Sequence, residues 1–320
     1  MNTPDKIARK RQQLIERTAA ALSVSETEAE RLFSIERKSS FRINTNKVED
    51  ELSLLAELSH LGWHGVQSKI YELGYTISDG RSSVVDSPAA QNGQIFIQNQ
   101  ASLLPVLALD PKPGEKILDM CAAPGGKSAH IAELTDGQAE LWVNDNSRNR
   151  LFKLRSNFER LGVRYDKLTM YGIDRLPHVM SIESFDKILL DAPCSGEGLI
   201  DINRAKDFEY WSLAQIKRLQ QLQKKGVSAA WRLLKPGGTL VYSTCTIAPE
   251  ENEAVINYLL TRNDDAELEP INYLPTSRVP ALSQWGNKDF TTDLSDCVRL
   301  APSEYFEAFF VAKITKKNVF

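Results

Sequence analysis

Hydrophobic and polar residues follow two different patterns along the chain. Over residues 5–36, apolar residues recur every three or four positions, which predicts two short amphipathic helices. Ser23 or Ser25 is expected to be the N-cap of the second helix, because Glu28 lies three residues after Ser25. The pattern then predicts a helix at 49–60 and strand-like segments at 41–44, 70–77 and 93–97. These elements indicate a small α+β domain over residues 1–105.

After the turn-rich stretch 110–114, short apolar runs alternate with longer amphipathic segments. This alternation is typical of a parallel sheet with helices on both faces, so we expect an α/β domain over residues 106–320. The predicted strands are 116–120, 141–144, 167–170, 187–190 and 239–243. The predicted helices are 128–134, 148–161, 213–234 and 249–261, and a hairpin over 299–313 follows. The last helix should begin at Pro249, with three glutamates near its positive end.

A glycine-containing loop joins the first of these strands to the first helix. Residues 117–128 read Ile-Leu-Asp-Met-Cys-Ala-Ala-Pro-Gly-Gly-Lys-Ser. In open α/β sheets, ligands bind where such a loop leaves the carboxyl end of the strand. The loop is not a P-loop, because Cys121 stands where the first glycine is needed, and the adjacent Gly125 and Gly126 do not form G-x-G-x-x-G. A polyphosphate-binding or nicotinamide-dependent enzyme is therefore disfavoured.

Asp145 ends the second strand, 19 residues after Gly126. A carboxylate at this position can accept hydrogen bonds from two ribose hydroxyls. The alternative, that Asp145 only caps the helix at 148–161, is less attractive beside such a loop. A ribose without a polyphosphate suits S-adenosylmethionine, which carries an adenosine and an amino-acid end.

Two further strand ends carry reactive side chains. Asp191 and Cys194 follow the fourth strand in Asp-Ala-Pro-Cys-Ser-Gly-Glu-Gly, and Cys245 follows the fifth in Tyr-Ser-Thr-Cys-Thr. Neighbouring parallel strands end at the same edge of a sheet, so both thiols and the carboxylate should lie beside the loop. The four cysteines, at 121, 194, 245 and 297, include no C-x-x-C pair, so no metal site is predicted.

Composition and charge narrow the class of protein further. Hydrophobic residues make up 42% and charged residues 25%, as in ordinary globular proteins, and no apolar run approaches the ~20 residues of a membrane span. No secretory signal is recognised, which predicts a cytoplasmic protein. The net charge is −3, yet residues 148–167 carry seven basic and two acidic side chains, and 204–235 carry eight and two. These runs are either solvated helix faces or phosphate contacts.

The motifs together resemble the RsmB/Nop/Sun family of RNA 5-methylcytosine methyltransferases, most closely the RsmF-type ribosomal RNA enzymes. The similarity includes CAAPGGK at 121–127, DAPCSGEG at 191–198, YSTCT at 242–246 with PEENE at 249–253, and segments 41–45, 98–102 and 309–312. Paired motif cysteines distinguish this family from DNA cytosine methyltransferases. The resemblance implies a class I, Rossmann-like α/β domain with a mostly parallel seven-stranded sheet. It also implies that the small α+β domain before it helps to position RNA.

The resemblance also implies the roles of the reactive residues. C5 of cytosine is a poor nucleophile, so a thiolate must first add to C6; this is covalent catalysis. By resemblance Cys245 is that nucleophile, Asp191 steadies or protonates N3, and Cys194 assists the loss of the C5 proton and the release of the enzyme.

The family's contacts to S-adenosylmethionine can be carried over residue by residue. Gly172 stands where the family usually has an aspartate for the adenine, so Asp174, two residues later, is expected to take that role. The expected cofactor-binding residues are Cys121, Ala122, Ala123, Pro124, Gly125, Gly126, Lys127, Asp145, Arg150, Asp174 and Asp191.

The sequence leaves the RNA substrate open between two classes. Ribosomal RNA is the first expectation and tRNA the alternative, with recognition assigned to the N-terminal domain and the basic helices. A non-catalytic RNA-binding assembly factor is a third possibility, disfavoured because Asp191 and both motif cysteines are present. The enzyme is expected to be a monomer that needs no metal and no membrane.

Overall fold

The computed structural model describes residues 3–273, 275 and 277–318. Its large sheet has the order β10-β13-β14-β8-β7-β4-β5-β6, and β9 also pairs with β14. The strands are β4 (Lys116–Asp119), β5 (Glu140–Asn144), β6 (Lys167–Thr169), β7 (Phe185–Asp191), β8 (Leu234–Thr244), β9 (Ala266–Glu269), β10 (Arg278–Val279), β13 (Val298–Leu300) and β14 (Phe309–Lys316). Strands β6, β5, β4, β7 and β8 are parallel, and β14 and β13 continue antiparallel. These seven strands form the expected sheet; the short β9 and β10 extend it.

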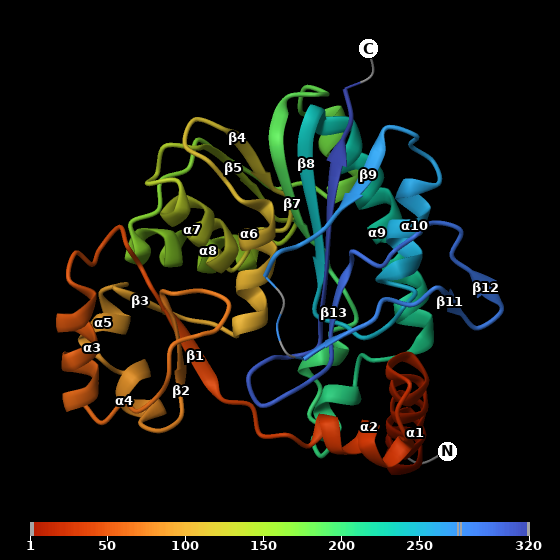
Figure 1. Cartoon of the computed structure of the whole chain (residues 1–320), viewed down its shortest axis with the longest axis horizontal. Helices are drawn as coiled ribbons and strands as arrows, with labels where there is room; N and C mark the ends of the chain where they lie inside the picture. The colour runs from red at the N-terminus through yellow and green to blue at the C-terminus, as the bar shows by residue number, and fades with distance from the viewer. Residues whose placement is uncertain (1–2, 274, 276, 319–320) are drawn as a thin grey trace.

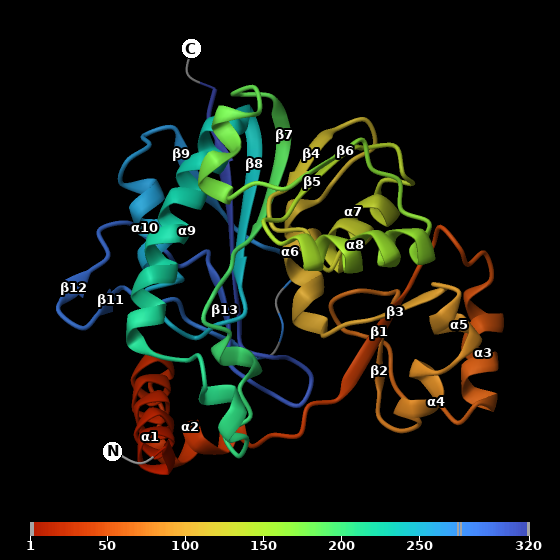
Figure 2. The same ribbon diagram turned by 180° about the vertical axis from the view of Figure 1, so that it is seen from behind.

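Helices cover both faces of this sheet (Figures 1 and 2). The front face in Figure 1 carries α6 (Leu104–Leu109), α7 (Gly126–Leu134) and α8 (Arg148–Leu161). The opposite face carries the 3-10 helix η2 (Ile173–His178), α9 (Leu213–Leu233) and α10 (Glu253–Leu260). This three-layer arrangement confirms the predicted α/β class and brings the carboxyl ends of the parallel strands to one edge.

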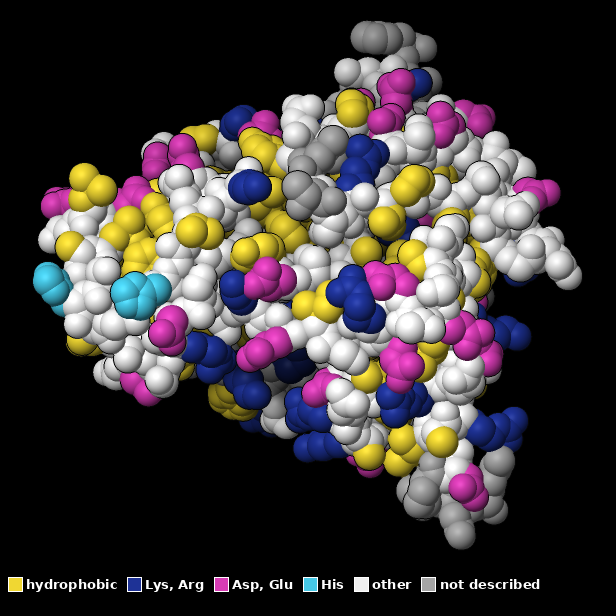
Figure 3. Space-filling model, turned by 60° about the horizontal axis from the view of Figure 1, so that its bottom comes forward, with side chains coloured by type: hydrophobic (Ala, Val, Ile, Leu, Met, Phe, Trp, Pro, Cys, Tyr) yellow, Lys and Arg dark blue, Asp and Glu magenta, His cyan; other side chains and the backbone are white. Residues whose placement is uncertain are grey.

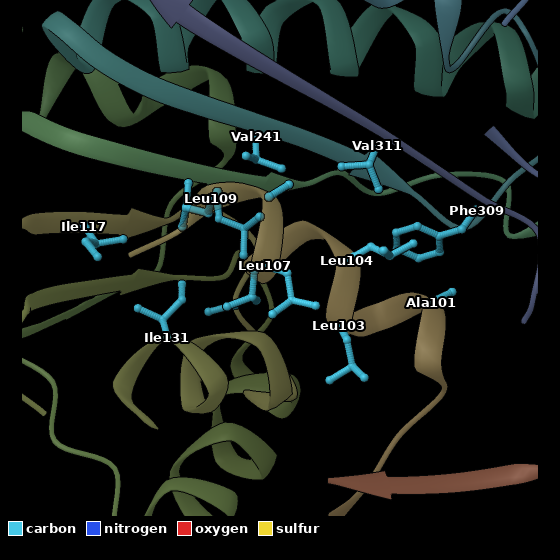
Figure 4. Packing of buried hydrophobic residues seen from close by; sticks show 14 of the residues in the cluster. Ala101, Leu103, Leu104, Leu107, Leu109, Ile117, Ile131, Val241, Phe309 and Val311 are labelled. Atoms are coloured by element: carbon cyan, nitrogen blue, oxygen red, sulfur yellow. The ribbon is translucent and has the colours of Figure 1, made fainter. Parts of the chain in front are cut away.

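The helix α6 fills the space between the sheet and α7 (Figure 4). All six of its residues are buried, and Leu104 and Leu107 lie in the same core as Ile131 of α7, Val241 of β8 and Val311 of β14. A helix buried on every side needs no polar face. This explains why its sequence shows no helical periodicity and why the sequence pattern does not predict it.

The last helix begins later than its sequence indicates. It was expected to start at Pro249, but α10 starts at Glu253. The physical reason is the burial of Glu251, whose carboxylate accepts hydrogen bonds from Ser195 N and from Gln223 Nε2. Tyr242 Oη donates to the Glu251 carbonyl at 2.6 Å. Residues 249–252 are therefore held in a turn by tertiary contacts.

The α+β unit lies beside α7 and α8, at the left of Figure 1. Its antiparallel sheet has the order β2-β1-β3 and packs against α3, α4 and α5. The elements are β1 (Ser39–Ile43), α3 (Glu51–His60), β2 (Gly74–Ile77), α4 (Arg81–Val85), α5 (Pro88–Gln91) and β3 (Ile95–Ile97). Arg42 of β1 and Glu133 of α7 form a fully buried ion pair at 2.6 Å, which joins this unit to the large domain.

The first two helices, α1 (Thr3–Leu22) and α2 (Glu26–Phe33), lie on the other side of the carboxyl edge (Figure 1). Ser25 caps α2 by accepting from Glu28 N, as predicted. Leu14 and Phe33 pack against Phe208 and Trp211, in the segment that contains η3 (Glu197–Leu199) and η4 (Ala205–Phe208). The 1–105 boundary stays a prediction, and these contacts link the first helices to the large domain.

The remaining short elements are η1 (Gln100–Leu103), β11 (Gln284–Trp285) and β12 (Lys288–Asp289). No helix in the described part of the chain has the length and hydropathy needed to cross a membrane.

Candidate active site

The loop between β4 and α7 depends on its two glycines. Gly125 has a φ of +108°, and a Cβ there would lie 2.9 Å from Phe158 Cε1. A Cβ on Gly126 would lie 2.7 Å from Phe96 Cε1. Only glycine fits such close approaches without displacing a ring. The loop is therefore clamped between α8 and the end of β3.

A cavity of about 300 Å³ opens beside this loop. It is lined by six of the seven predicted loop residues, together with Asp191. Its other lining residues are Phe96, Ile97, Gln98, Asn99, Ser102, Asp119 and Glu307. The α+β unit thus contributes one wall of the cavity through the end of β3. Cys194 and Cys245 are not among the lining residues.

Asp119 ends β4 at the base of the loop. Its Oδ2 accepts from Ser128 Oγ at 2.6 Å, and its Oδ1 accepts from Cys121 N at 3.2 Å. Burial raises the pKa of Asp119 to about 7, although both hydrogen bonds oppose the shift. The Asp119 carboxyl group thus holds the two ends of the loop together. The motif alone did not reveal this role.

Asp145 lies directly after β5, where it was expected. Ser147, rather than Asp145, caps α8, which removes the simple capping explanation. Asp145 is 2% exposed. Its Oδ1 accepts from Ser147 N at 3.0 Å, while its Oδ2 accepts no hydrogen bond from any described residue. Oδ2 is ion-paired with Arg150 but accepts no aligned hydrogen bond, so it keeps the capacity to accept one from a ligand hydroxyl.

Arg150 connects Asp145 to the loop. Its Nη1 lies 3.0 Å from Asp145 Oδ2 as an ion pair, and its Nη2 donates to the Ala123 carbonyl. Asn144, which sequence reasoning missed, joins three strand ends, because its Nδ2 donates to the carbonyls of Met120 and Tyr171 at 3.0 Å each. These contacts fix the positions from which a bound cofactor would be held.

Asp174 is exposed, in the first turn of η2. A Cβ built on Gly172 would lie 3.0 Å from Asp174 Oδ1. The Asp174 carboxylate therefore lies close to where a side chain at position 172 would begin. This position is compatible with Asp174 taking the role that an aspartate at position 172 would have.

Asp191 ends β7 and is held by two donors. Ser243 Oγ donates to Oδ1 at 2.7 Å, and Lys127 Nζ donates to Oδ2 at 2.8 Å. Asp191 pairs with Ser243 in the parallel register of β7 and β8. Burial opposes the charge on Lys127, but Asp191 outweighs it and raises the pKa of Lys127. The ion pair fixes the carboxylate at the mouth of the cavity.

Cys194 and Cys245 lie together beyond Asp191. Their sulfur atoms are 3.3 Å apart, within hydrogen-bond distance, and both residues are partly accessible. The hydrogen bond with Cys245, with burial, raises the pKa of Cys194 well above its ordinary value. Cys194 therefore keeps its proton at neutral pH and can donate it toward Cys245. Cys121 is also partly accessible, whereas Cys297 is buried in the core.

Two buried glutamates hold the cysteine loops together. Ser195 and Thr246, the residues after the two cysteines, form a hydroxyl–hydroxyl hydrogen bond at 2.8 Å. Ser195 Oγ donates to Glu251 and so accepts from Thr246 Oγ1, which also lies 2.9 Å from Glu197 Oε2. Burial raises the pKa of Glu251 to about 7, against the hydrogen bonds from Ser195 and Gln223. This network fixes the spacing of the two sulfurs.

Some residues of the site were not singled out from the sequence. Glu307 lines the cavity just before β14, and Asn99 Oδ1 accepts from Glu307 N at 3.4 Å. Asn99 belongs to a segment noted in the resemblance, whereas Glu307 carried no signal except a charge before an apolar strand. Within the described residues, no group of three or more His, Cys, Asp or Glu could hold a metal ion.

Comparison with known proteins places this geometry in context. Residues 106–315 match a family model described as 16S rRNA methyltransferase RsmB/F. The chain is 36% identical to the tRNA (cytosine(49)-C(5))-methyltransferase of Pyrococcus abyssi, over 87% of this chain and 88% of that protein. It is 35% identical to the ribosomal RNA small subunit methyltransferase F of Klebsiella pneumoniae, over 87% of this chain but 57% of that protein.

The structure is also similar to solved ones. A methyltransferase homologue from Pyrococcus horikoshii superimposes with a TM-score of 0.77 and is 33% identical, covering 96% of this chain and 99% of that one. The chain thus matches the archaeal relatives over nearly their whole length, whereas it spans little more than half of the bacterial relative.

Proposed function

Because the chain belongs to the RsmB/F family of methyltransferases, we propose that it transfers a methyl group from S-adenosylmethionine to C5 of a cytosine in RNA. The observation that carries this proposal is the pair of sulfurs 3.3 Å apart where β7 and β8 end, beside Asp191. An RNA-binding protein without catalysis has no need for two cysteines at this spacing. The non-catalytic alternative is accordingly set aside.

The reaction begins with Cys245. Its thiolate forms a bond to C6 of the cytosine, and the electron pair of the C5–C6 double bond moves toward C5 and N3. Asp191 stabilises or protonates N3 during this addition. C5 is then electron-rich enough to take the methyl group. With the help of Cys194, the C5 proton passes to solvent and its bonding pair forms the C5–C6 double bond again. The C6–sulfur bond then breaks with its electrons returning to Cys245.

The residues present fit S-adenosylmethionine. Asp145 Oδ2 is ion-paired with Arg150 but accepts no aligned hydrogen bond, so it can accept one from a ribose hydroxyl, and Asp174 lies near the position expected to contact the adenine. The loop 121–127 and Asp191 would hold the amino-acid end beside the cavity, with Arg150 keeping the loop in place. When bound, the sulfonium supplies an electrophilic methyl group.

Replacing Asp145 by Asn should weaken cofactor binding without disturbing RNA binding. The charged acceptor for the ribose hydroxyls is lost, so we expect the Kd for S-adenosylmethionine to rise by roughly 10- to 100-fold. Calorimetric titration measures this directly. Asp136→Asn, in an exposed turn after α7, is the matched control and should bind normally. An unchanged Kd for Asp145→Asn would remove Asp145 from the cofactor site.

RNA is the proposed substrate, and the surface around the carboxyl edge suits it. A groove of about 940 Å³ runs between α2 and the β2–α4 loop, and Arg31, Arg37, Lys38 and Arg81 are among its lining residues. Figure 3 shows Lys and Arg side chains gathered on this underside of the molecule. Basic side chains at such an edge would contact phosphates, with an affinity that falls as salt rises.

Ribosomal RNA is the proposed target, and tRNA is the alternative. The family description and the bacterial relative name rRNA. The archaeal relative, which matches this chain over 88% of its own length, is named for tRNA, and this coverage favours tRNA as the second candidate. The monomeric state and the cytoplasmic location stay predictions.

Bisulfite sequencing of rRNA and tRNA from cells with and without the gene tests the function and separates the two targets. We expect one or a few cytosines to lose protection from deamination when the gene is deleted, and to regain it when the gene is restored. A gene carrying Cys245→Ser should not restore protection. Unchanged rRNA and tRNA would contradict the proposed function.

A further inference from the structure

Glu307 is a buried carboxyl group in the cavity that the mechanism above does not use. Its residue is 7% exposed, and it lines the cavity together with Asp191 and Lys127. Its backbone is fixed by Asn99. Among the described residues, none donates a hydrogen bond to its carboxyl oxygens. The carboxyl group therefore lines the cavity with its capacity to accept hydrogen bonds unused by the described residues.

Burial and the charged groups around Glu307 together place its pKa near neutral pH. Burial raises its pKa to about 7, Lys127 and Arg37 oppose this shift, and Asp191 adds to it. Above that pH the side chain is a carboxylate and can only accept hydrogen bonds. The cavity therefore contains an acceptor that is available to a donor on a ligand.

Cytosine supplies such a donor. Its pairing edge carries two acceptors, O2 and N3, and one donor, the 4-amino group, whereas uracil presents a donor at N3 and an acceptor at O4. Enzymes that act on an extruded base read it by hydrogen bonds to this edge. The cavity offers the Lys127 ammonium, which can only donate, and three carboxyl groups, Asp119, Asp191 and Glu307. Asp119 already accepts from Ser128 and Cys121, and Asp191 from Ser243 and Lys127, which leaves Glu307 as the acceptor without a donor among the described residues.

We propose that Glu307 accepts a hydrogen bond from the 4-amino group of the target cytosine and so selects cytosine against uracil. This inference rests on the proposed function, because it assumes that a cytosine enters the cavity beside Asp191. A carboxylate in this place leaves uracil O4 facing a second acceptor. A site built to bind one hydrogen-bonding group rejects the analogue that lacks it, because its own buried polar group is then left unpaired.

The test compares Glu307→Gln with the unaltered enzyme on two forms of one transcript, which spans the cytosine found by bisulfite sequencing. The first form carries cytosine, and the second carries 2-pyrimidinone, which is cytosine without its amino group. We expect Glu307→Gln to lower kcat/KM for the cytosine form by roughly 10- to 100-fold. For the pyrimidinone form the loss should be under about threefold, because this form lacks the amino group whose charge-assisted hydrogen bond the variant weakens.

For each enzyme, kcat/KM on the two transcripts is measured with one preparation. Partial unfolding of a variant then lowers both values by the same factor. Glu267→Gln, on the distant strand β9 and paired with Lys317, is the matched control and should leave both values unchanged. Equal losses on the two transcripts, or no loss, would overturn the assignment. A weaker Kd for S-adenosylmethionine in Glu307→Gln would also overturn it, because Glu307 would then serve the cofactor. Failure of the proposed function is recognised separately, by a Cys245→Ser enzyme that remains active.

Discussion

Replacing Cys245 by Ser is expected to lower the rate of methyl transfer to RNA by about 10⁴-fold or more. A hydroxyl is far less ionised than a thiol at neutral pH and adds poorly to C6, so C5 is never activated. The substitution keeps the size of the side chain, and the neighbouring hydrogen bond between Ser195 and Thr246 is untouched. Incorporation of labelled methyl groups into RNA from cells lacking the gene measures the loss.

Two controls separate chemistry from folding. Cys297→Ala removes a thiol that is buried in the core, away from the site, and should change the rate by only a few-fold. Cofactor binding by Cys245→Ser should be unchanged, because Cys245 does not line the cavity. Equal methyl incorporation by Cys245→Ser and the unaltered enzyme would refute the assigned nucleophile.

Replacing Cys194 by Ser is expected to trap the enzyme on its RNA. The Cys194 sulfur lies 3.3 Å from Cys245, where it can assist the steps that follow methyl transfer. Without it, Cys245 still adds to C6, but loss of the C5 proton and release of the product become slow. Proton-transfer groups contribute about 10²- to 10⁴-fold, so turnover should fall within that range.

The trapped species gives a direct readout. Denaturing electrophoresis should show a protein–RNA complex that survives detergent in Cys194→Ser and is absent from Cys194→Ser/Cys245→Ser. The band should need both RNA and S-adenosylmethionine for its full intensity. If Cys194→Ser turned over normally and gave no such band, Cys194 would have no part in product release.

The sequence predicts the parallel part of the sheet well because its signals are local. Short apolar runs ended by glycine, proline or aspartate mark β4, β5 and β7, and each ends within two residues of its expected position. The proximity of Cys194 and Cys245 follows from the same logic, because each comes directly after one of two neighbouring parallel strands. The roles of these residues rest on the family resemblance and stay proposals.

The features that escape prediction depend on contacts between distant segments. Glu307 reaches the cavity because β14 runs antiparallel beside β8, more than 180 residues after the loop at Gly125. The late start of α10 depends on Ser195 and Gln223, which bind Glu251 from other elements. The position of α1 is decided by apolar side chains near Trp211. Periodicity along the chain carries no information about such partners.

The family match begins at residue 106, yet the segments before that residue are bound to the large domain at two separate places. A fragment starting there would lose Arg42, the ion-pair partner of Glu133, and the α+β unit that packs beside α7. It would also expose the apolar surface around Phe208 and Trp211 to water. The region that the family model matches is therefore smaller than the unit over which the buried contacts of the large domain are complete.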